Sequence, residues 1–141
     1  MSLVADDSVL VTVLPHQVSG YWIEVEPMIE KALRRGGSHL SALKIFENLL
    51  KGEMLLWLSK RSGRIEACCV TQIVNWPLAR VVFIILISGV AMENWLHFEG
   101  DVTEYARQQY CTAIEGYGRF GWVRAAPEGW EPVHVLLRKK L

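Results

Sequence analysis

The sequence has 141 residues, and its 15 Lys and Arg residues balance its 15 Asp and Glu residues, so the formal net charge is zero. A nucleic-acid-binding domain normally carries a basic excess, so this balance argues against that class of partner. The length fits one domain, residues 1–141, with a core large enough to need no disulfide or metal staple.

Cysteine and histidine spacing argues against disulfides and metal sites. The three cysteines cannot close a disulfide framework, and we interpret Cys68, Cys69 and Cys111 as reduced. The four histidines are scattered, without the pairs that bind zinc, so we expect no metal. The uncharged, mostly apolar stretch of residues 81–92 is shorter than the roughly 18 to 20 residues that span a bilayer, and the acidic N-terminus does not resemble a signal peptide. We therefore expect a soluble, cytoplasmic protein with no membrane contact.

A strand and a helix are expected first in the chain. Residues Ser8 to Leu14 alternate among Val, Leu and Thr and end at a proline, which is typical of a short strand. Apolar residues then recur at helical spacing from Val18 to Leu33. Pro27 lies inside this pattern and is expected to kink or restart the helix.

A second helix is expected after Gly36-Gly37. Ser38 is the expected N-cap, and Gly52 is the expected C-terminal stop. Helical spacing assigns four apolar residues to the buried face: Leu40, Leu43, Phe46 and Leu50.

A β-hairpin should follow. Residues Met54 to Ser59 and Arg64 to Asn75 have strand composition, and residues 60–63 form the turn between them. Simple alternation in the second strand assigns these residues to one face: Ile65, Ala67, Cys69, Thr71 and Ile73.

The next unit is expected to be a strand, a helix and a parallel strand. Residues Val81 to Ile87 are seven consecutive apolar residues, which predicts a central strand buried on both faces. A helix from about Met92 to Tyr110 follows, and Cys111 to Gly116 returns to strand character. The expected buried stripe of this helix is Met92, Trp95, Leu96, Val102, Tyr105, Ala106 and Tyr110.

The chain should close with a short helix within Gly118 to Ala126 and a strand from Trp130 to Lys139, with Val133, Val135 and Leu137 on one face. The full order is then β-α-α-β-β-β-α-β-α-β. It predicts a mixed α/β (α+β) fold with a central twisted sheet and helices on both faces.

This order is similar to that of the GNAT superfamily of N-acyltransferases. The run Glu104-Tyr105-Ala106-Arg107, followed by Cys111 and by residues 118–124, resembles small GNAT-like proteins encoded by tailed phages or prophages. The likeness covers about Val18 to the C-terminus. It implies a location in the cytoplasm of a bacterial host, or association with a virion.

The resemblance also implies a coenzyme site. In GNAT enzymes the strand that corresponds to Val81–Ile87 splays from its neighbour and receives the pantetheine arm of acyl-coenzyme A, while the pyrophosphate binds N–H groups at the start of the next helix. The corresponding residues are Ile87, Ser88, Gly89, Val90 and Ala91.

This loop departs from the pattern of the family. Only Gly89 matches the spaced small residues, and Glu93 adds a negative charge beside the phosphates. The sequence therefore predicts weak binding of acetyl-coenzyme A, with a dissociation constant above about 1 mM.

No catalytic residue is assigned by the sequence. Many GNAT enzymes use a tyrosine before a Gly-Phe pair as general acid, but no tyrosine directly precedes Gly129-Trp130, and Tyr117 lies several residues too early. The polar residues nearest to a general base on expected strands are Glu66, Gln72 and Glu115.

Two functional hypotheses follow. One is an N-acetyltransferase that uses acetyl-coenzyme A. The alternative is a non-catalytic phage structural, assembly or host-interaction module that binds a virion or host protein. Large aromatic residues are enriched at interfaces, and the expected partner patch consists of Trp76, Arg119, Trp122 and Trp130. The remaining tryptophans, Trp22, Trp57 and Trp95, are expected in the core.

Overall fold

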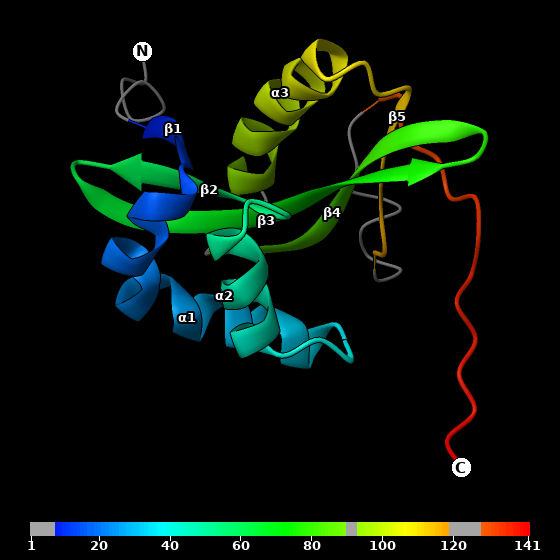
Figure 1. Cartoon of the computed structure of the whole chain (residues 1–141), viewed down its shortest axis with the longest axis horizontal. Coiled ribbons are helices and arrows are strands. Elements are labelled where there is room, and N and C mark those ends of the chain that lie inside the picture. The colour runs from blue at the N-terminus through cyan, green and yellow to red at the C-terminus, as the bar shows by residue number, and fades with distance from the viewer. Residues whose placement is uncertain (1–7, 90–92, 119–127) are drawn as a thin grey trace.

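The computed structural model describes residues 8–89, 93–118 and 128–141, and for residues 93–97 it describes the backbone only. Within these ranges the chain forms a five-stranded mixed sheet with helices on both faces (Figure 1). In chain order the elements are β1 (Ser8–Val13), the 3-10 turn η2 (Pro15–Gln17), α1 (Val18–Arg35), α2 (Ala42–Leu50), β2 (Leu55–Arg61), β3 (Arg64–Trp76), β4 (Ala79–Gly89), α3 (Glu93–Gln108) and β5 (Ala113–Gly116).

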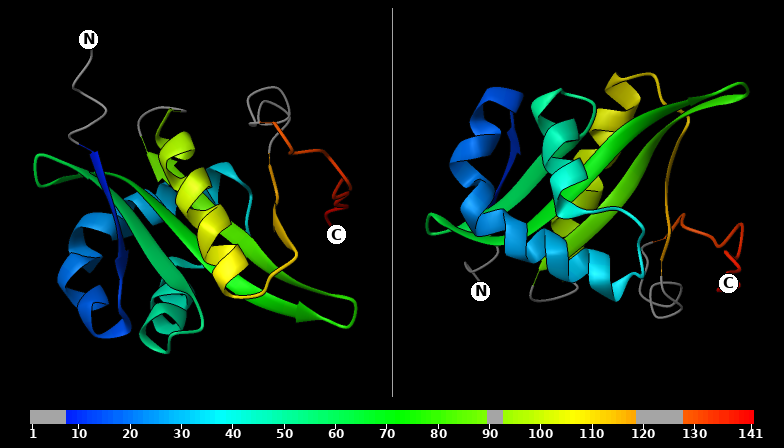
Figure 2. Two further views of the ribbon diagram at one scale, coloured as in Figure 1. Left: turned by 90° about the horizontal axis from the view of Figure 1, so that it is seen from above. Right: turned by 60° about the horizontal axis from the view of Figure 1, so that its bottom comes forward.

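The strands follow one another in space as they do in sequence. Strands β1 to β4 are antiparallel neighbours, and β5 pairs with β4 in parallel after the α3 crossover. Helices α1 and α2 cover one face of the sheet, and α3 covers the other (Figures 1 and 2). The predicted fold class, the interior position of β4 and the parallel β4–α3–β5 unit are confirmed.

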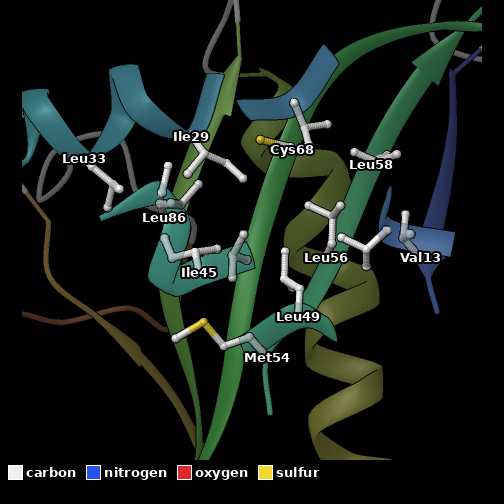
Figure 3. Packing of buried hydrophobic residues seen from close by; sticks show 14 residues of the cluster. Val13, Ile29, Leu33, Ile45, Leu49, Met54, Leu56, Leu58, Cys68 and Leu86 are labelled. Carbon is white, nitrogen blue, oxygen red and sulfur yellow. The ribbon is translucent and has the colours of Figure 1, made fainter. Parts of the chain in front are cut away.

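The face under α1 and α2 holds the larger of two apolar cores (Figure 3). Helix α1 contributes Val25, Ile29 and Leu33, which lie on one stripe, and it continues through Pro27 with a bend along its length (Figure 2). Helix α2 contributes Ile45 and Leu49, and the inward residues of the strands include Leu56, Leu58, Cys68, Val70 and Leu86. Burial on this side fixes the register of the first four strands.

The opposite face is closed by α3. Its buried stripe is Phe98, Val102 and Ala106, which pack on residues such as Trp57 and Val82 of the sheet. Phe98 is fully buried although the predicted stripe omitted it. Tyr110, which was predicted on the stripe, is exposed and has a positive φ of 61°, because α3 has already ended at Gln108. The side chains of Trp95 and Leu96, and all of Met92, lie outside the described residues.

The predicted start of the second helix is wrong, and of its predicted buried face only Phe46 packs against the core. The N-cap is Ser41, whose Oγ accepts a hydrogen bond from the Lys44 backbone N–H at 3.1 Å. The Ser38 Oγ instead accepts a hydrogen bond from the Leu40 backbone N–H within the preceding loop. The later start places Ile45 and Leu49 inward and leaves these predicted core residues exposed: Leu40, Leu43 and Leu50.

The hairpin turn is tighter than predicted, because β2 and β3 run up to Ser62-Gly63. Both residues of this two-residue turn have positive φ, as primed hairpin turns require. Just beyond it, Glu66 is an extra residue in β3, since Lys60 pairs with Ile65 and Ser59 pairs with Ala67. This bulge moves Ile65 to the α1/α2 face, so the predicted common face with Ala67 and Cys69 is wrong for Ile65.

The predicted closing strand is also wrong. Residues 130–141 form no helix or strand, and Val133, Val135 and Leu137 are exposed. Their alternation suits a strand, but a strand also needs a neighbouring edge, which the described part of the chain does not bring to them. Most of the predicted helix within Gly118 to Ala126 lies outside the described residues.

Candidate functional site: an opening between β4 and β5

Strand β4 is paired unequally on its two sides. Toward β3 the ladder runs the whole length of β4, from Ala79 to Gly89. Toward β5 it covers only Val81–Ile84, which pair with Ala113–Gly116. From Ile85 onward, no described residue pairs with this side of β4. Within the described residues, alternate backbone N–H and C=O groups along that stretch therefore lack a ladder partner, and they are the candidate contacts for a ligand.

A β-bulge lies at the point where the β5 ladder ends. Val70 pairs with Leu86 and Thr71 pairs with Ile84, so Ile85 is an extra residue in β4. A bulge bends its strand and increases the local twist. Because Ile84 is the last residue paired with β5, this bend gives a local cause for the separation of the two strands.

The bulge also explains why β4 is apolar without interruption. Val82 and Ile84 pack in the α3 core, but Ile85 and Leu86 both pack toward α1 and α2. Ile87 then returns to the α3 side. The extra residue shifts the alternation of side chains between the two faces by one position. Because each face of β4 is covered by a core, apolar residues are needed at every position around the bulge.

Strands β4 and β5 lie very close together at Gly116, the last paired residue of β5. A Cβ atom on Gly116 would lie 3.2 Å from the Ile84 carbonyl oxygen and 3.4 Å from the Ile84 Cβ. Glycine allows β5 to approach β4 closely at its last paired residue, immediately before the strands part.

Two polar side chains lie beside this opening on β5 and just after it. Glu115 pairs with Phe83, one residue before the ladder ends. The Tyr117 ring lies edge-on against Phe83, with 5.3 Å between ring centroids, and its side chain is 78% exposed. By sequence spacing Tyr117 lies too early to match the general-acid tyrosine of the family. Its contact with Phe83 cannot be seen in the sequence, because it depends on the pairing of β5 with β4.

The other predicted base candidates lie elsewhere. Glu66 forms an ion pair with Arg61 at 3.2 Å, beside the β2–β3 turn. Gln72 lines a separate cavity of about 360 Å³ between β3, the start of β2 and Tyr105 of α3. In that cavity the Arg80 guanidinium donates to the Gln109 carbonyl and to Asn75, so it ties β4 to the end of α3.

Neither buried thiol is suited to nucleophilic chemistry. Burial raises the pKa of Cys68 to about 12, and burial and the neighbouring Cys68 raise the pKa of Cys69 well above its usual value. Burial also raises the pKa of Tyr105, with a further contribution from Cys111 and an opposing one from Arg80. All three cysteines are free.

The predicted coenzyme residues fall at the end of β4 and beyond it. Ile87, Ser88 and Gly89 form the last part of the strand and pair with Cys69, Cys68 and Ala67. Val90 and Ala91 lie outside the described residues, and α3 begins at Glu93, whose side chain is not described. The strand-to-helix connection is thus where the sequence predicted it, and the phosphate contacts stay a prediction.

The predicted partner patch is divided among different elements. Trp76 is 59% exposed at the tip of the β3–β4 hairpin. Trp130 packs against the α3 core, and its Nε1 donates to Glu99 Oε1 at 3.4 Å. Arg119 and Trp122 lie outside the described residues, so a common patch stays a prediction.

Comparison with solved structures identifies the architecture. The chain matches a GNAT family acetyltransferase from Staphylococcus aureus with a TM-score of 0.66 and 12% identity, covering 96% of this chain and 99% of that one. It also matches the aminoglycoside acetyltransferase meta-AAC0020 from an uncultured soil metagenomic sample, with a TM-score of 0.69, 7% identity and coverage of 98% and 99%. A predicted acetyltransferase from Clostridium acetobutylicum, solved with acetyl-CoA, matches with a TM-score of 0.68 and 9% identity. That match covers 94% of this chain and 96% of the other.

The chain has the GNAT acetyltransferase fold. No family model and no curated protein sequence matches it. At these identities the likeness establishes the architecture, and activity has to be argued from the site.

Proposed function

We propose that this protein is an N-acyltransferase that holds acyl-coenzyme A in the opening between β4 and β5. One observation carries the proposal: the β4–β5 ladder ends at Ile84, and the bulge residue Ile85 directly follows it. The predicted acetyltransferase from Clostridium acetobutylicum, which was solved with acetyl-CoA, shares the fold and supports this assignment.

The residues of the opening fit the extended part of the coenzyme. Pantetheine is a thin chain with two amide groups, and an extended amide chain can hydrogen-bond to a free strand edge as an added strand does. The edge from Ile85 to Gly89 offers such groups. When bound, the coenzyme supplies the acyl group as an activated thioester.

We assign proton handling to the two polar residues beside the opening. Tyr117 carries a phenolic proton on Oη and is positioned by its contact with Phe83. Glu115 is exposed on the last strand and can accept a proton from an amine. Glu115 lies on the strand that bounds the opening, and Tyr117 directly follows that strand, so both residues adjoin the site proposed for the thioester.

The expected affinity for the coenzyme is low. Gly89 alone matches the family loop, and Glu93 opens α3 with a negative charge. Our sequence prediction of a dissociation constant above about 1 mM therefore stands for acetyl-coenzyme A. We expect Glu93→Gln to tighten binding at low salt, since it removes a like charge and keeps the side-chain shape.

The proposal is tested by measuring release of free coenzyme A from acetyl-coenzyme A in the presence of a panel of amines. We expect Tyr117→Phe to lower turnover by roughly 10²-fold or more without a matching change in coenzyme affinity, because the variant loses the phenolic hydroxyl and keeps the ring that contacts Phe83. Tyr110→Phe is the matched control, since Tyr110 is exposed beyond the end of α3 and its loss should leave turnover unchanged. Equal losses in the two variants would remove Tyr117 from its assigned role.

A second function is supported by the exposed hairpin tip. Leu78 is 99% exposed beside the exposed Trp76, and exposed apolar side chains of this size suit a protein contact. Absence of both coenzyme binding and coenzyme A release would give first place to the non-catalytic module. Its phage or prophage origin, and a virion or host protein as partner, stay predictions from the family resemblance.

A further inference from the structure

The cavity of about 360 Å³ beside Arg80 lies on the α3 face of the sheet, apart from the opening between β4 and β5. Its walls come from residues 52–55, the second half of β3, the start of β4 and Tyr105 of α3. Arg80 precedes the bulge residue Ile85 by five residues, which is about 16 Å along an extended strand. The cavity is therefore separate from the site proposed for the thioester.

Arg80 supplies a fixed positive charge to this cavity. Its partly buried side chain donates from Nε to the Gln109 carbonyl oxygen at 2.8 Å and from Nη1 to Asn75 Oδ1 at 2.9 Å. Both acceptors are neutral, and no described carboxylate forms an ion pair with Arg80. A guanidinium that is already held in place and has no counter-ion is suited to bind a carboxylate.

Neutral hydrogen-bonding groups also line the cavity. The β2–β3 ladder begins where Leu55 pairs with Thr71, so among the described residues the next part of β3, residues 72–75, has no neighbour on that side. Alternate N–H and C=O groups along this edge are candidate contacts for a ligand. The Tyr105 hydroxyl bonds to no described residue, and burial raises the pKa of Tyr105, so this hydroxyl keeps its proton at neutral pH and can donate it.

A negative charge and an apolar wall complete the lining. Glu53, in the loop between α2 and β2, forms no ion pair with Arg80 or with any other described residue. The two opposite charges of the cavity therefore do not neutralise each other directly. Met54, Leu55 and Ile73 supply apolar lining. A molecule with a carboxylate, an ammonium group and an apolar body would complement these walls.

We propose that this cavity binds a free α-amino acid with an apolar side chain. The carboxylate pairs with Arg80, the ammonium group pairs with Glu53 and with carbonyl groups of the β3 edge, and the side chain lies against the apolar wall. The volume is near the lower end of the range of about 300–1,000 Å³ for small-molecule sites, which favours so small a ligand. The inference holds whether or not the proposed acyltransferase activity is present.

Titration with L-leucine, followed by nuclear magnetic resonance of the backbone amides, tests the site. We expect the signals of Leu55 and of residues 72–75 to shift and saturate with a dissociation constant below about 1 mM, while those of residues 85–89 stay in place. L-Methionine and L-phenylalanine are titrated in the same way. Absence of saturable shifts with all three amino acids at about 10 mM would overturn the proposal.

Two analogues of leucine separate the contributions of its charges. 3-Methylbutylamine lacks the carboxylate and should bind at least roughly 30-fold more weakly than L-leucine, because it loses the contact with Arg80. 4-Methylpentanoate lacks the ammonium group and should bind roughly 3- to 10-fold more weakly, since Glu53 is exposed and its attraction is screened. Binding of either analogue as tightly as L-leucine would contradict the assignment of a zwitterion.

Variants of the two charged residues complete the test. We expect Arg80→Gln to weaken binding of L-leucine by at least roughly 30-fold. Because Arg80 also ties β4 to the end of α3, Glu53→Gln in the exposed loop gives a second variant, which should weaken binding roughly 3- to 10-fold. Glu47→Gln is the matched control, since Glu47 lies on α2 and does not line the cavity. Equal affinities in Glu53→Gln and Glu47→Gln would overturn the proposal. No titration here contains coenzyme, so failure is distinguishable from failure of the proposed function.

Discussion

The first four strands of the sheet are longer, more fully paired and more deeply buried than the fifth strand. Strands β3 and β4 are 13 and 11 residues long and have apolar side chains packed on both faces. Strand β5 has four residues, of which three are exposed, and it pairs only with the Val81–Ile84 part of β4. Stability should therefore concentrate in β1 to β4, and the described residues leave one side of β4 without a ladder partner beyond Ile84.

The largest expected effect is a loss of stability when a core side chain packed on β1 to β4 is removed. Phe98→Ala removes a fully buried ring from the α3 core and should lower the free energy of unfolding by about 3–5 kcal/mol. Ile45→Ala in the α1/α2 core should cost about 2–5 kcal/mol. Urea unfolding of the variants measures both values.

Leu43→Ala is the matched control for these core variants. Leu43 is 65% exposed on α2, so its loss should change stability by less than about 0.5 kcal/mol. A cost for Leu43→Ala equal to that of Ile45→Ala would mean that the buried face of α2 is the one predicted by sequence.

A smaller effect is expected from the buried thiols at high pH. Burial raises the pKa of Cys68 from 9.0 to about 12, so the folded state retains a proton that the unfolded state releases. Its contribution to stability is complete below pH 9 and is lost as pH rises toward 12, at about 1.4 kcal/mol per pH unit. Unfolding measured from pH 8 to 11 should show this decline.

Cys68→Val keeps the approximate volume of the side chain and removes the titrating group. We expect the decline in stability above pH 9 to be shallower in this variant than in the wild type, with Cys69 still contributing. An unchanged slope would show that other groups cause the alkaline loss.

The smallest expected effects compare two glycines. Gly116→Ala would place a Cβ 3.2 Å from the Ile84 carbonyl oxygen, and we expect a loss of roughly 1 kcal/mol at the end of the β5 ladder. Gly100→Ala meets no atom within 4 Å inside α3 and should stabilise the protein by about 1 kcal/mol. Thermal unfolding can resolve the opposite signs, and stabilisation by both changes would show that β4 and β5 are not in close contact there.

Periodicity in the sequence predicted most elements because it reports burial directly. The strand from Val81, the helix after it and the parallel return strand all follow from apolar spacing, and the structure confirms them. Spacing does not fix the first residue of a helix, so the sequence predicts Ser38 as the cap where the structure has Ser41. Spacing also predicts a strand from Trp130 to Lys139, which the structure does not contain, since alternation does not show whether an edge lies nearby.

The site was less accessible to sequence reasoning. The bulge at Ile85 cannot be recognised in a run of apolar residues, because it is defined by the partners in β3. The spacing of Tyr117 does not match that of the general-acid tyrosine of the family. The pairing of β5 with β4 is what brings the Tyr117 ring to Phe83. The location of the opening was predicted through the family resemblance, and its physical cause required the pairing register.

The most direct test of the central claim is a titration of the backbone amide signals with acetyl-coenzyme A, followed by nuclear magnetic resonance. If the free edge of β4 holds the coenzyme, the signals of Ile85 to Gly89 and of Gly116 should shift and saturate with a dissociation constant above about 1 mM, while those of β1 and β2 stay in place. Unchanged signals along Ile85 to Gly89 at about 10 mM coenzyme, or shifts confined to other strands, would contradict the account.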